Sequence, residues 1–163
     1  MAADTLAALA ARVGERLKQK GLMLATAESC TGGWVAQAVT SVSGSSDWFD
    51  RGFVTYSNDA KCDMLGVSVQ TLAARGAVSE ETAREMAAGA LGRSRASAAL
   101  AVTGVAGPTG GTPGKPVGMV CFAWALRDGA IESETRRFEG DREAVRRQSV
   151  QHSLQGLLER LQV

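Results

Sequence analysis

The feature that most constrains this chain is the alternation of short apolar runs with longer amphipathic segments. The runs at 22–26, 52–56 and 98–102 are rich in apolar and β-branched residues and are too short for helices. Segments such as 5–20 and 142–161 carry apolar residues at helical spacing. Strands that alternate with helices predict a sheet that is largely parallel and covered on both faces.

Capping residues locate the helices between these runs. A helix is expected over 34–42, and a short helix is expected to begin at Asn58 or Asp59, whose side chains are good N-caps. Ser79 is placed to cap a longer helix over 80–93. That helix begins with two glutamates, which interact favourably with its dipole.

The C-terminal half adds a hairpin before the last helix. Asp128-Gly129 is a strong turn signal between strands expected at 117–126 and 131–138. The predicted order of elements is α-β-α-β-α-α-β-β-β-α. We therefore expect one domain over 1–163, with an α/β fold built as a three-layer α/β/α sandwich around a mixed sheet. In such folds ligands bind beyond the carboxyl ends of the strands.

Charge and hydropathy argue against several classes of partner. The 18 Lys and Arg residues nearly balance the 17 Asp and Glu residues, so nothing electrostatic favours nucleic acid or an anionic membrane. No apolar run approaches the roughly 20 residues of a membrane-spanning helix. The first segment carries Arg12, Glu15 and Arg16, unlike a signal peptide. We expect a cytoplasmic protein that binds neither nucleic acid nor membrane.

The cysteine and histidine counts limit the chemistry. The three cysteines, Cys30, Cys62 and Cys121, are odd in number and lack a C-x-x-C spacing, so neither a disulfide framework nor a zinc site is expected. The single histidine, His152, lies about 200° around the last helix from Leu154 of its apolar stripe, which predicts a solvated side chain. No metal or cofactor is expected.

Ser29 is the first candidate for chemistry. It lies in a loop between the first strand and the next helix, followed by Thr31, Gly32 and Gly33. A helix N-terminus offers free backbone N–H groups, and glycines allow close approach to them. This arrangement suits a phosphate or the oxyanion of acyl transfer. The alternative is that Ser29 or Thr31 simply caps the helix.

A nucleophilic serine needs a base, and Lys61 is the candidate that remains. It follows the second strand in a polar loop that also contains Tyr56 and Asn58. A lysine acts as a base only if burial or a nearby positive charge lowers its pKa to about 7–8. Lys61 is otherwise a solvated surface group. Cys30 is an alternative nucleophile if the helix N-terminus stabilises its thiolate, and otherwise a buried inert thiol.

The long loop over 103–118 is rich in glycine and proline. It begins with Thr103 and Gly104 and continues through Gly107, but it matches neither G-x-G-x-x-G nor a Walker A sequence. Such a loop either cradles a phosphate with its N–H groups or only connects strands. Lys115, near its end, is either a ligand contact or a solvated residue.

Two arginines open the last helix on one face. Arg142 and Arg146 are spaced i, i+4. Paired arginines grip a phosphate or carboxylate, but they also occur on solvated charged faces, and Glu139, Asp141 and Glu143 lie nearby. The pattern leaves both readings open.

Together these stretches resemble the CinA C-terminal domain family, the nicotinamide-nucleotide amidohydrolases. The resemblance covers about residues 5–160, and the segments that carry it are 27–33, 52–58, 76–79, 104–108, 115–118 and 140–142. It implies a CinA-like fold and hydrolysis of nicotinamide mononucleotide to nicotinic acid mononucleotide and ammonia, in pyridine nucleotide recycling. It also implies Ser29 as nucleophile and Lys61 as base, with Tyr56, Thr103 and Arg142 at the site.

The combined hypothesis assigns a role to each group of residues. The catalytic residues are expected to be Ser29, Lys61 and Tyr56, and the substrate-binding residues Thr31, Gly32, Gly33, Thr103, Gly104, Gly107 and Arg142. A homodimer is expected, because a chain with three tryptophans has material for an apolar contact face. The alternatives are a non-catalytic module that binds a nucleotide phosphate, and a different amide or ester substrate on the same residues.

Overall fold

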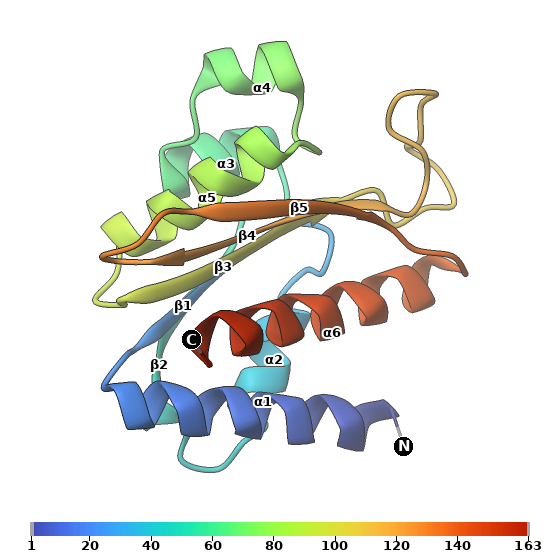
Figure 1. The fold of residues 1–163 in the computed structure, drawn as a ribbon. Helices are drawn as coiled ribbons and strands as arrows, with labels where there is room; N and C mark the ends of the chain where they lie inside the picture. The colour runs from blue at the N-terminus through green and yellow to red at the C-terminus, as the bar shows by residue number, and fades with distance from the viewer. Residues whose placement is uncertain (1, 163) are drawn as a thin grey trace.

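Five strands form one mixed sheet in the computed structural model, which describes residues 2–162 and the side chains from residue 6 onward. The strands are β1 (Leu24–Glu28), β2 (Phe49–Val54), β3 (Ala98–Gly104), β4 (Met119–Leu126) and β5 (Glu132–Arg137). Their order is β2-β1-β3-β4-β5. β1 is parallel to both β2 and β3, whereas β4 is antiparallel to β3 and β5 (Figure 1). The predicted mixed sheet is confirmed.

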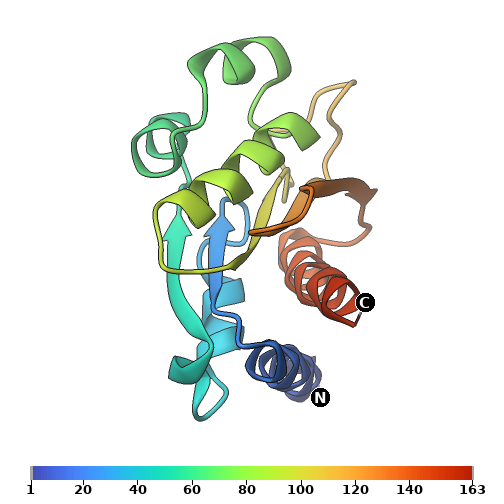
Figure 2. The ribbon, with the colours of Figure 1, turned by 60° about the vertical axis from the view of Figure 1, so that its left-hand side comes forward.

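Helices cover both faces of the sheet and complete the three layers. The helices of one face are α1 (Ala2–Lys20), α2 (Trp34–Thr40) and α6 (Arg142–Leu161). The helices on the other side are α3 (Asn58–Leu65), α4 (Val69–Arg75) and α5 (Glu80–Gly92), with α5 next to the sheet (Figures 1 and 2). Along β3, Leu100 and Val102 belong to the core under α1 and α6, whereas Ala99 and Ala101 belong to the core under α5. The strand is buried on both sides, as its unbroken apolar sequence predicts.

Small residues bring α3 close to α5, and α3 carries Lys61. A Cβ added at Gly89 of α5 would lie 2.0 Å from the carbonyl oxygen of Leu65, at the end of α3. Any side chain at Gly89 would therefore push α3 outward. Ala83, Ala87 and Ala90 of α5 are likewise fully buried. The close packing fixes the helix that positions the candidate base.

The element boundaries differ from the sequence expectation in several places, of which three bear on the site. β1 (Leu24–Glu28) begins and ends two residues later than predicted, whereas β2 (Phe49–Val54) begins three residues and ends two residues earlier than predicted. Ser57 caps α3 by accepting from the N–H of Ala60, so the prediction of Asn58 or Asp59 as the cap was wrong. α4 was not expected; it has only seven residues and none of them is fully buried. Its start is fixed by the cap Ser68.

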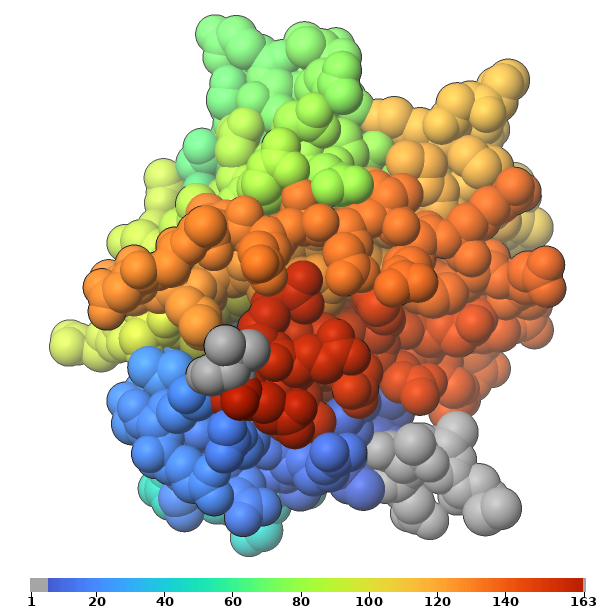
Figure 3. All heavy atoms as spheres, in the orientation of Figure 1, coloured from blue at the N-terminus to red at the C-terminus, as the bar shows by residue number. Residues whose placement is uncertain are grey.

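The prediction of a solvated His152 was wrong. Its side chain is 22% exposed, and its Nε2 lies 2.8 Å from a carboxylate oxygen of Glu134 on β5. Its ring centroid lies 4.6 Å from that of Phe122. In the space-filling view the surface of α6 lies between those of α1 and β5 (Figure 3). A helical wheel shows which side of α6 is apolar, but not that the β4–β5 hairpin also covers its flank.

None of the helices among the described residues combines the length and the apolar character that crossing a membrane requires. Within the same residues, no group of three or more His, Cys, Asp or Glu side chains is arranged to hold a metal ion.

Candidate active site

The parallel strands bring the first two predicted loops to one edge of the sheet. Glu28 at the end of β1 is in register with Val54 of β2 and Val102 of β3. Beyond that point the N–H of Ser29 donates to the carbonyl of Val102 (3.0 Å), and the N–H of Thr55 donates to the carbonyl of Glu28 (2.8 Å). Ser29 therefore lies directly beside the segment that leads into α3.

Lys61 and Ser29 are in hydrogen-bond contact. The Nζ of Lys61 lies 3.0 Å from the Oγ of Ser29 and 2.7 Å from the carbonyl oxygen of Thr55. Lys61 is 1% exposed, whereas Ser29 keeps 8% of its surface accessible. The amine is thus enclosed behind the hydroxyl, and the serine is the member of the pair that a ligand can reach.

The surroundings of Lys61 favour its neutral form. Burial lowers the pKa of Lys61 below its ordinary value of 10.5, and the nearby thiols of Cys30 and Cys62 oppose this only in part. The two hydrogen-bond acceptors of the amine are a hydroxyl and a carbonyl, which carry no full charge. A lowered pKa is the property that a lysine base requires.

Cys30 is unsuited to the nucleophile role that was left open for it. Burial raises the pKa of the Cys30 thiol to about 12. The thiolate is the reactive form of cysteine, so this thiol is inert near neutral pH. The structure favours the alternative of a buried, unreactive cysteine.

A buried carboxylate occupies the start of α2. Glu28 is 1% exposed, and its Oε1 accepts from the Oγ1 of Thr31 (2.5 Å) and the N–H of Val35 (2.8 Å). Oε1 also accepts from the N–H of Gly33 (3.2 Å), and Oε2 accepts from the N–H of Ala36 (3.0 Å). The protein therefore satisfies the free N–H groups of this helix with its own anion.

This arrangement corrects part of the expected oxyanion site. The N–H of Gly33 is bound to Glu28, and the N–H of Gly32 donates to the carbonyl of Ser29 (3.0 Å). The expectation that both glycines present free N–H groups to a ligand was wrong. Their φ angles of 59° and 104° instead allow the sharp turn after Ser29. Residues 29–33 are called the nucleophile loop below.

Arg142 contacts both Tyr56 and Gly107. The family resemblance implied that Arg142 and Tyr56 lie at the site. The Nη1 of Arg142 donates to the carbonyl of Gly107 (2.8 Å), and its Nη2 lies 3.3 Å from the hydroxyl of Tyr56. Tyr56 is 64% exposed, and among the described residues its hydroxyl contacts neither Ser29 nor Lys61. Tyr56 therefore contacts Arg142 and not the pair formed by Ser29 and Lys61, which is called the dyad below.

Thr103 and Gly104 have structural partners at the end of β3. The hydroxyl of Thr103 donates to the carbonyl of Ala77 (2.9 Å), in the connection between α4 and α5. A Cβ at Gly104 would lie 2.8 Å from the carbonyl oxygen of Met119, so only glycine fits there. Lys115 donates to the carbonyl of Arg75. That contact ties the glycine-rich loop to the end of α4.

Two side chains important to this site were not assigned a role from the sequence. Glu28 is one, and the signal was available: an acid at the end of a buried strand, directly before a helix. Arg146 is the other. It was noted only as a partner of Arg142, but its Nε and Nη2 donate to the carbonyls of Cys30 and Thr31, both at 3.1 Å.

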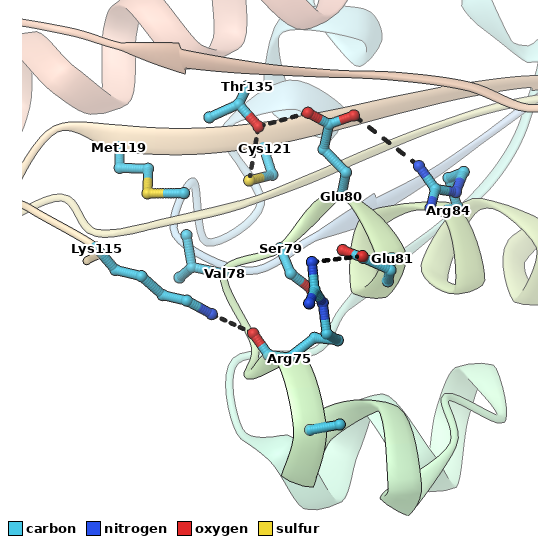
Figure 4. Close-up of a pocket in the computed structure, with 11 residues that line it drawn as sticks. Arg75, Val78, Ser79, Glu80, Glu81, Arg84, Lys115, Met119, Cys121 and Thr135 are labelled. Atoms are coloured by element: carbon cyan, nitrogen blue, oxygen red, sulfur yellow. Dashed lines mark hydrogen bonds and ion pairs between the residues drawn. The ribbon is translucent and has the colours of Figure 1, made fainter.

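The cavity in Figure 4 is a separate feature. It has a volume of about 490 Å³ and lies between α5, β4, β5 and the end of α4. Its charged groups are largely paired within it, as in the contact of Arg75 with Glu81 at 2.9 Å. Neither Ser29 nor Lys61 lines it. The dyad therefore lies outside this hollow.

Comparison with known proteins identifies the family. The model of the CinA C-terminal domain matches residues 6–161. The chain belongs to the CinA C-terminal domain family. It is 53% identical to the nicotinamide-nucleotide amidohydrolase PncC of Escherichia coli K12 over 159 residues, which cover 96% of this chain and 95% of that protein. It is 52% identical to the protein of the same name from Pseudomonas putida, over 96% of this chain and 97% of that one.

A solved structure in the family has the same fold. The crystal structure of the competence/damage inducible protein CihA from Agrobacterium tumefaciens matches with a TM-score of 0.93 and 49% sequence identity. The match covers 97% of this chain and 96% of that one. The predicted CinA-like fold is confirmed.

Proposed function

We propose that this protein hydrolyses the carboxamide of nicotinamide mononucleotide to nicotinic acid mononucleotide and ammonia. The observation that carries the proposal is the buried contact between Lys61 and Ser29, at 3.0 Å. The similarity to amidohydrolases named for nicotinamide nucleotides supports the substrate. A module that only binds nucleotides gains nothing from burying an amine against a hydroxyl, so the geometry favours the enzyme.

The proposed reaction proceeds through an acyl-enzyme. Neutral Lys61 accepts the proton of Ser29 as its Oγ attacks the carboxamide carbon. The protonated amine then gives that proton to the leaving nitrogen, and the C–N bond breaks to release ammonia. Water next attacks the ester carbon while Lys61 accepts a proton from the water. The C–Oγ bond then breaks, Lys61 returns the proton to Oγ, and the carboxylic acid is released. The pyridinium charge already makes the carbonyl carbon electrophilic.

Substrate binding is proposed to involve Arg142 and the glycine-rich loop. The guanidinium of Arg142 lies against the carbonyl of Gly107, and it has further N–H donors for a phosphate. The exposed ring of Tyr56 lies at the same arginine and offers an aromatic face to the pyridinium cation. Binding energy from the remote phosphate can position the amide and raise turnover.

We further propose a cytoplasmic homodimer that acts in pyridine nucleotide recycling. Two of the three tryptophans, Trp48 and Trp124, are each 2% exposed and cannot form the expected contact face, whereas Trp34 is half-buried. Among the described side chains, the exposed large hydrophobic ones are Val54, Tyr56, Met64 and Val69. Light scattering coupled to size exclusion tests the dimer, and a monomeric mass at micromolar concentration would contradict it.

The function is tested by ammonia release from nicotinamide mononucleotide, with nicotinamide riboside and nicotinamide as comparison substrates. The proposal expects the mononucleotide to have the highest kcat/KM, and Ser29→Ala to eliminate the release. A wild-type protein that binds the mononucleotide without releasing ammonia would support the binding module instead. If the enzyme prefers an unrelated amide or ester, the roles of Ser29 and Lys61 would stand, but nicotinamide mononucleotide would not be the substrate.

A further inference from the structure

Arg146 holds the nucleophile loop by its carbonyl groups, whereas Glu28 binds N–H groups. Its guanidinium donates to the carbonyls of Cys30 and Thr31, whereas Glu28 accepts from N–H groups at the start of α2. The ring of Trp34 lies 5.5 Å from the guanidinium carbon of Arg146, which further restricts the side chain. The loop is therefore clamped by one anion and one cation.

Because the peptide bond is planar, a contact that fixes a carbonyl group also fixes the direction of the N–H group in the same peptide unit. In a trans peptide unit the C=O and the N–H point in opposite directions. The carbonyl of Cys30 shares its unit with the N–H of Thr31. When Arg146 fixes that carbonyl on its own side of the loop, the N–H of Thr31 is directed to the other side.

That N–H is one of two backbone donors of the loop, with that of Cys30, for which the described residues provide no acceptor. Ser29 donates to Val102, Gly32 to Ser29, and Gly33 to Glu28. The N–H of Cys30 has no hydrogen-bond acceptor among the described residues either. For the N–H of Thr31 no acceptor is found within residues 2–162. A buried loop seldom leaves a backbone donor unsatisfied unless a ligand or water completes it.

We propose that Arg146 is a positioning residue that aims the N–H of Thr31 at the oxyanion formed on the carbonyl attacked by Ser29. This inference rests on the proposed function for its substrate, but it concerns any acyl or phosphonyl group transferred to Ser29. The positive charge of Arg146 also polarises the shared peptide unit, which strengthens the donor at its far end. An oxyanion forms only on the way to the transition state, so losing its donor lowers kcat rather than raising KM.

The test compares Arg146→Ala with Arg147→Ala. Arg147 is the matched control, because it also lies over Trp34, at 5.3 Å, and its ion pair with Glu143 is separate from the loop. We expect Arg146→Ala to lower kcat by about 10- to 100-fold with KM within about threefold of wild type. Added guanidinium ion should restore part of the kcat. Arg147→Ala should stay within about twofold of wild type.

A second readout separates this inference from the proposed substrate. An alkyl fluorophosphonate forms an Oγ–P bond with Ser29 as fluoride leaves and Lys61 accepts the proton. Intact mass gives the rate of this labelling without any nucleotide. If wild type labels but does not hydrolyse nicotinamide mononucleotide, the proposed function fails, while the effect of Arg146→Ala on labelling still tests the inference.

Two results would overturn the positioning role. One is a kcat and a labelling rate for Arg146→Ala that both match wild type. The other is a loss of activity that guanidinium does not restore and that Arg147→Ala shares, since this would indicate a general role in packing. Thermal melts report whether the variants fold. If Arg146→Ala does not fold, Arg146→Gln, which keeps one amide donor, is measured in the same way.

Discussion

The nucleophile loop and the glycine-rich loop meet at the same end of the sheet but are held very differently. In the nucleophile loop Glu28 binds backbone N–H groups, Arg146 binds backbone carbonyls, and the N–H of Ser29 donates to β3. In the glycine-rich loop residues 108–114 are exposed, and its tip is closed mainly by the reciprocal bonds of Thr112 and Lys115. That loop projects from the body of the molecule (Figures 1 and 2).

The difference suggests a division of work between the loops. Electrostatic stabilisation of a transition state is strongest when donors are already oriented before the substrate arrives. A loop with few contacts to the rest of the fold can adjust to a ligand at low cost. The rigid loop therefore suits the reacting bond, and the exposed loop suits the distant phosphate. Each prediction below tests one side of this contrast.

The largest effect is expected from the dyad itself. Ser29→Ala and Lys61→Met should each lower kcat for nicotinamide mononucleotide by at least about 10³-fold, because nucleophile and base act as a unit. Methionine fills a similar volume to lysine without the amine, so the fold should persist. Stopped assays of ammonia give the rates, and circular dichroism checks folding. A Lys61→Met variant with more than a tenth of the wild-type kcat would remove the lysine from the mechanism.

A large effect on stability is expected at Glu28. Glu28→Gln removes the charge and one acceptor, so the N–H groups of α2 lose their anion. The free energy of unfolding should fall by about 1–3 kcal/mol, and kcat should fall as the loop loosens. Urea denaturation measures the stability. Asp141→Asn, at the exposed cap of α6, is the control, because asparagine is an equally good N-cap. Equal stability of wild type and Glu28→Gln would show that the carboxylate does not hold the loop.

A smaller effect, confined to substrate binding, is expected at Arg142, which contacts the glycine-rich loop. Arg142→Ala should raise KM for nicotinamide mononucleotide roughly 10-fold, about 1.4 kcal/mol of binding, with little change in kcat. Nicotinamide riboside lacks the phosphate, so its kcat/KM should be nearly unchanged by the substitution. The exposed Arg136 of β5 provides a control as Arg136→Ala. Equal losses for both substrates would place Arg142 away from the phosphate.

The strands, most of the helices and the two central site residues could be predicted from the sequence, because the signals for them lie within a few residues. The apolar runs and caps located the strands and most helices, because periodicity and N-caps act within a few residues. Ser29 and Lys61 were singled out by their positions after strands. The family resemblance implied their contact, but local sequence patterns could not show it, because it depends on the pairing of β1 with β2 and on the close packing of α3 against Gly89.

The groups that hold the nucleophile loop were harder to predict for the same reason. Arg146 reaches Cys30 across 116 positions in the chain, and nothing in its own helix distinguishes it from Arg142. Glu28 was readable as a carboxylate before a helix, but its location inside the protein was not. That the N–H of Thr31 lacks an acceptor depends on the hydrogen bonds of the folded loop, which the sequence does not reveal.

The most direct test of the account is the pH dependence of kcat/KM for nicotinamide mononucleotide. Lys61 must be neutral to accept the proton of Ser29, and burial lowers its pKa from 10.5. The rate should therefore be low in acid, rise as the lysine loses its proton, and level off below pH 10.5. Labelling of Ser29 by a fluorophosphonate should rise over the same interval. A rate that is constant from acid to pH 10, or that falls as the pH rises through this interval, would contradict a lysine base.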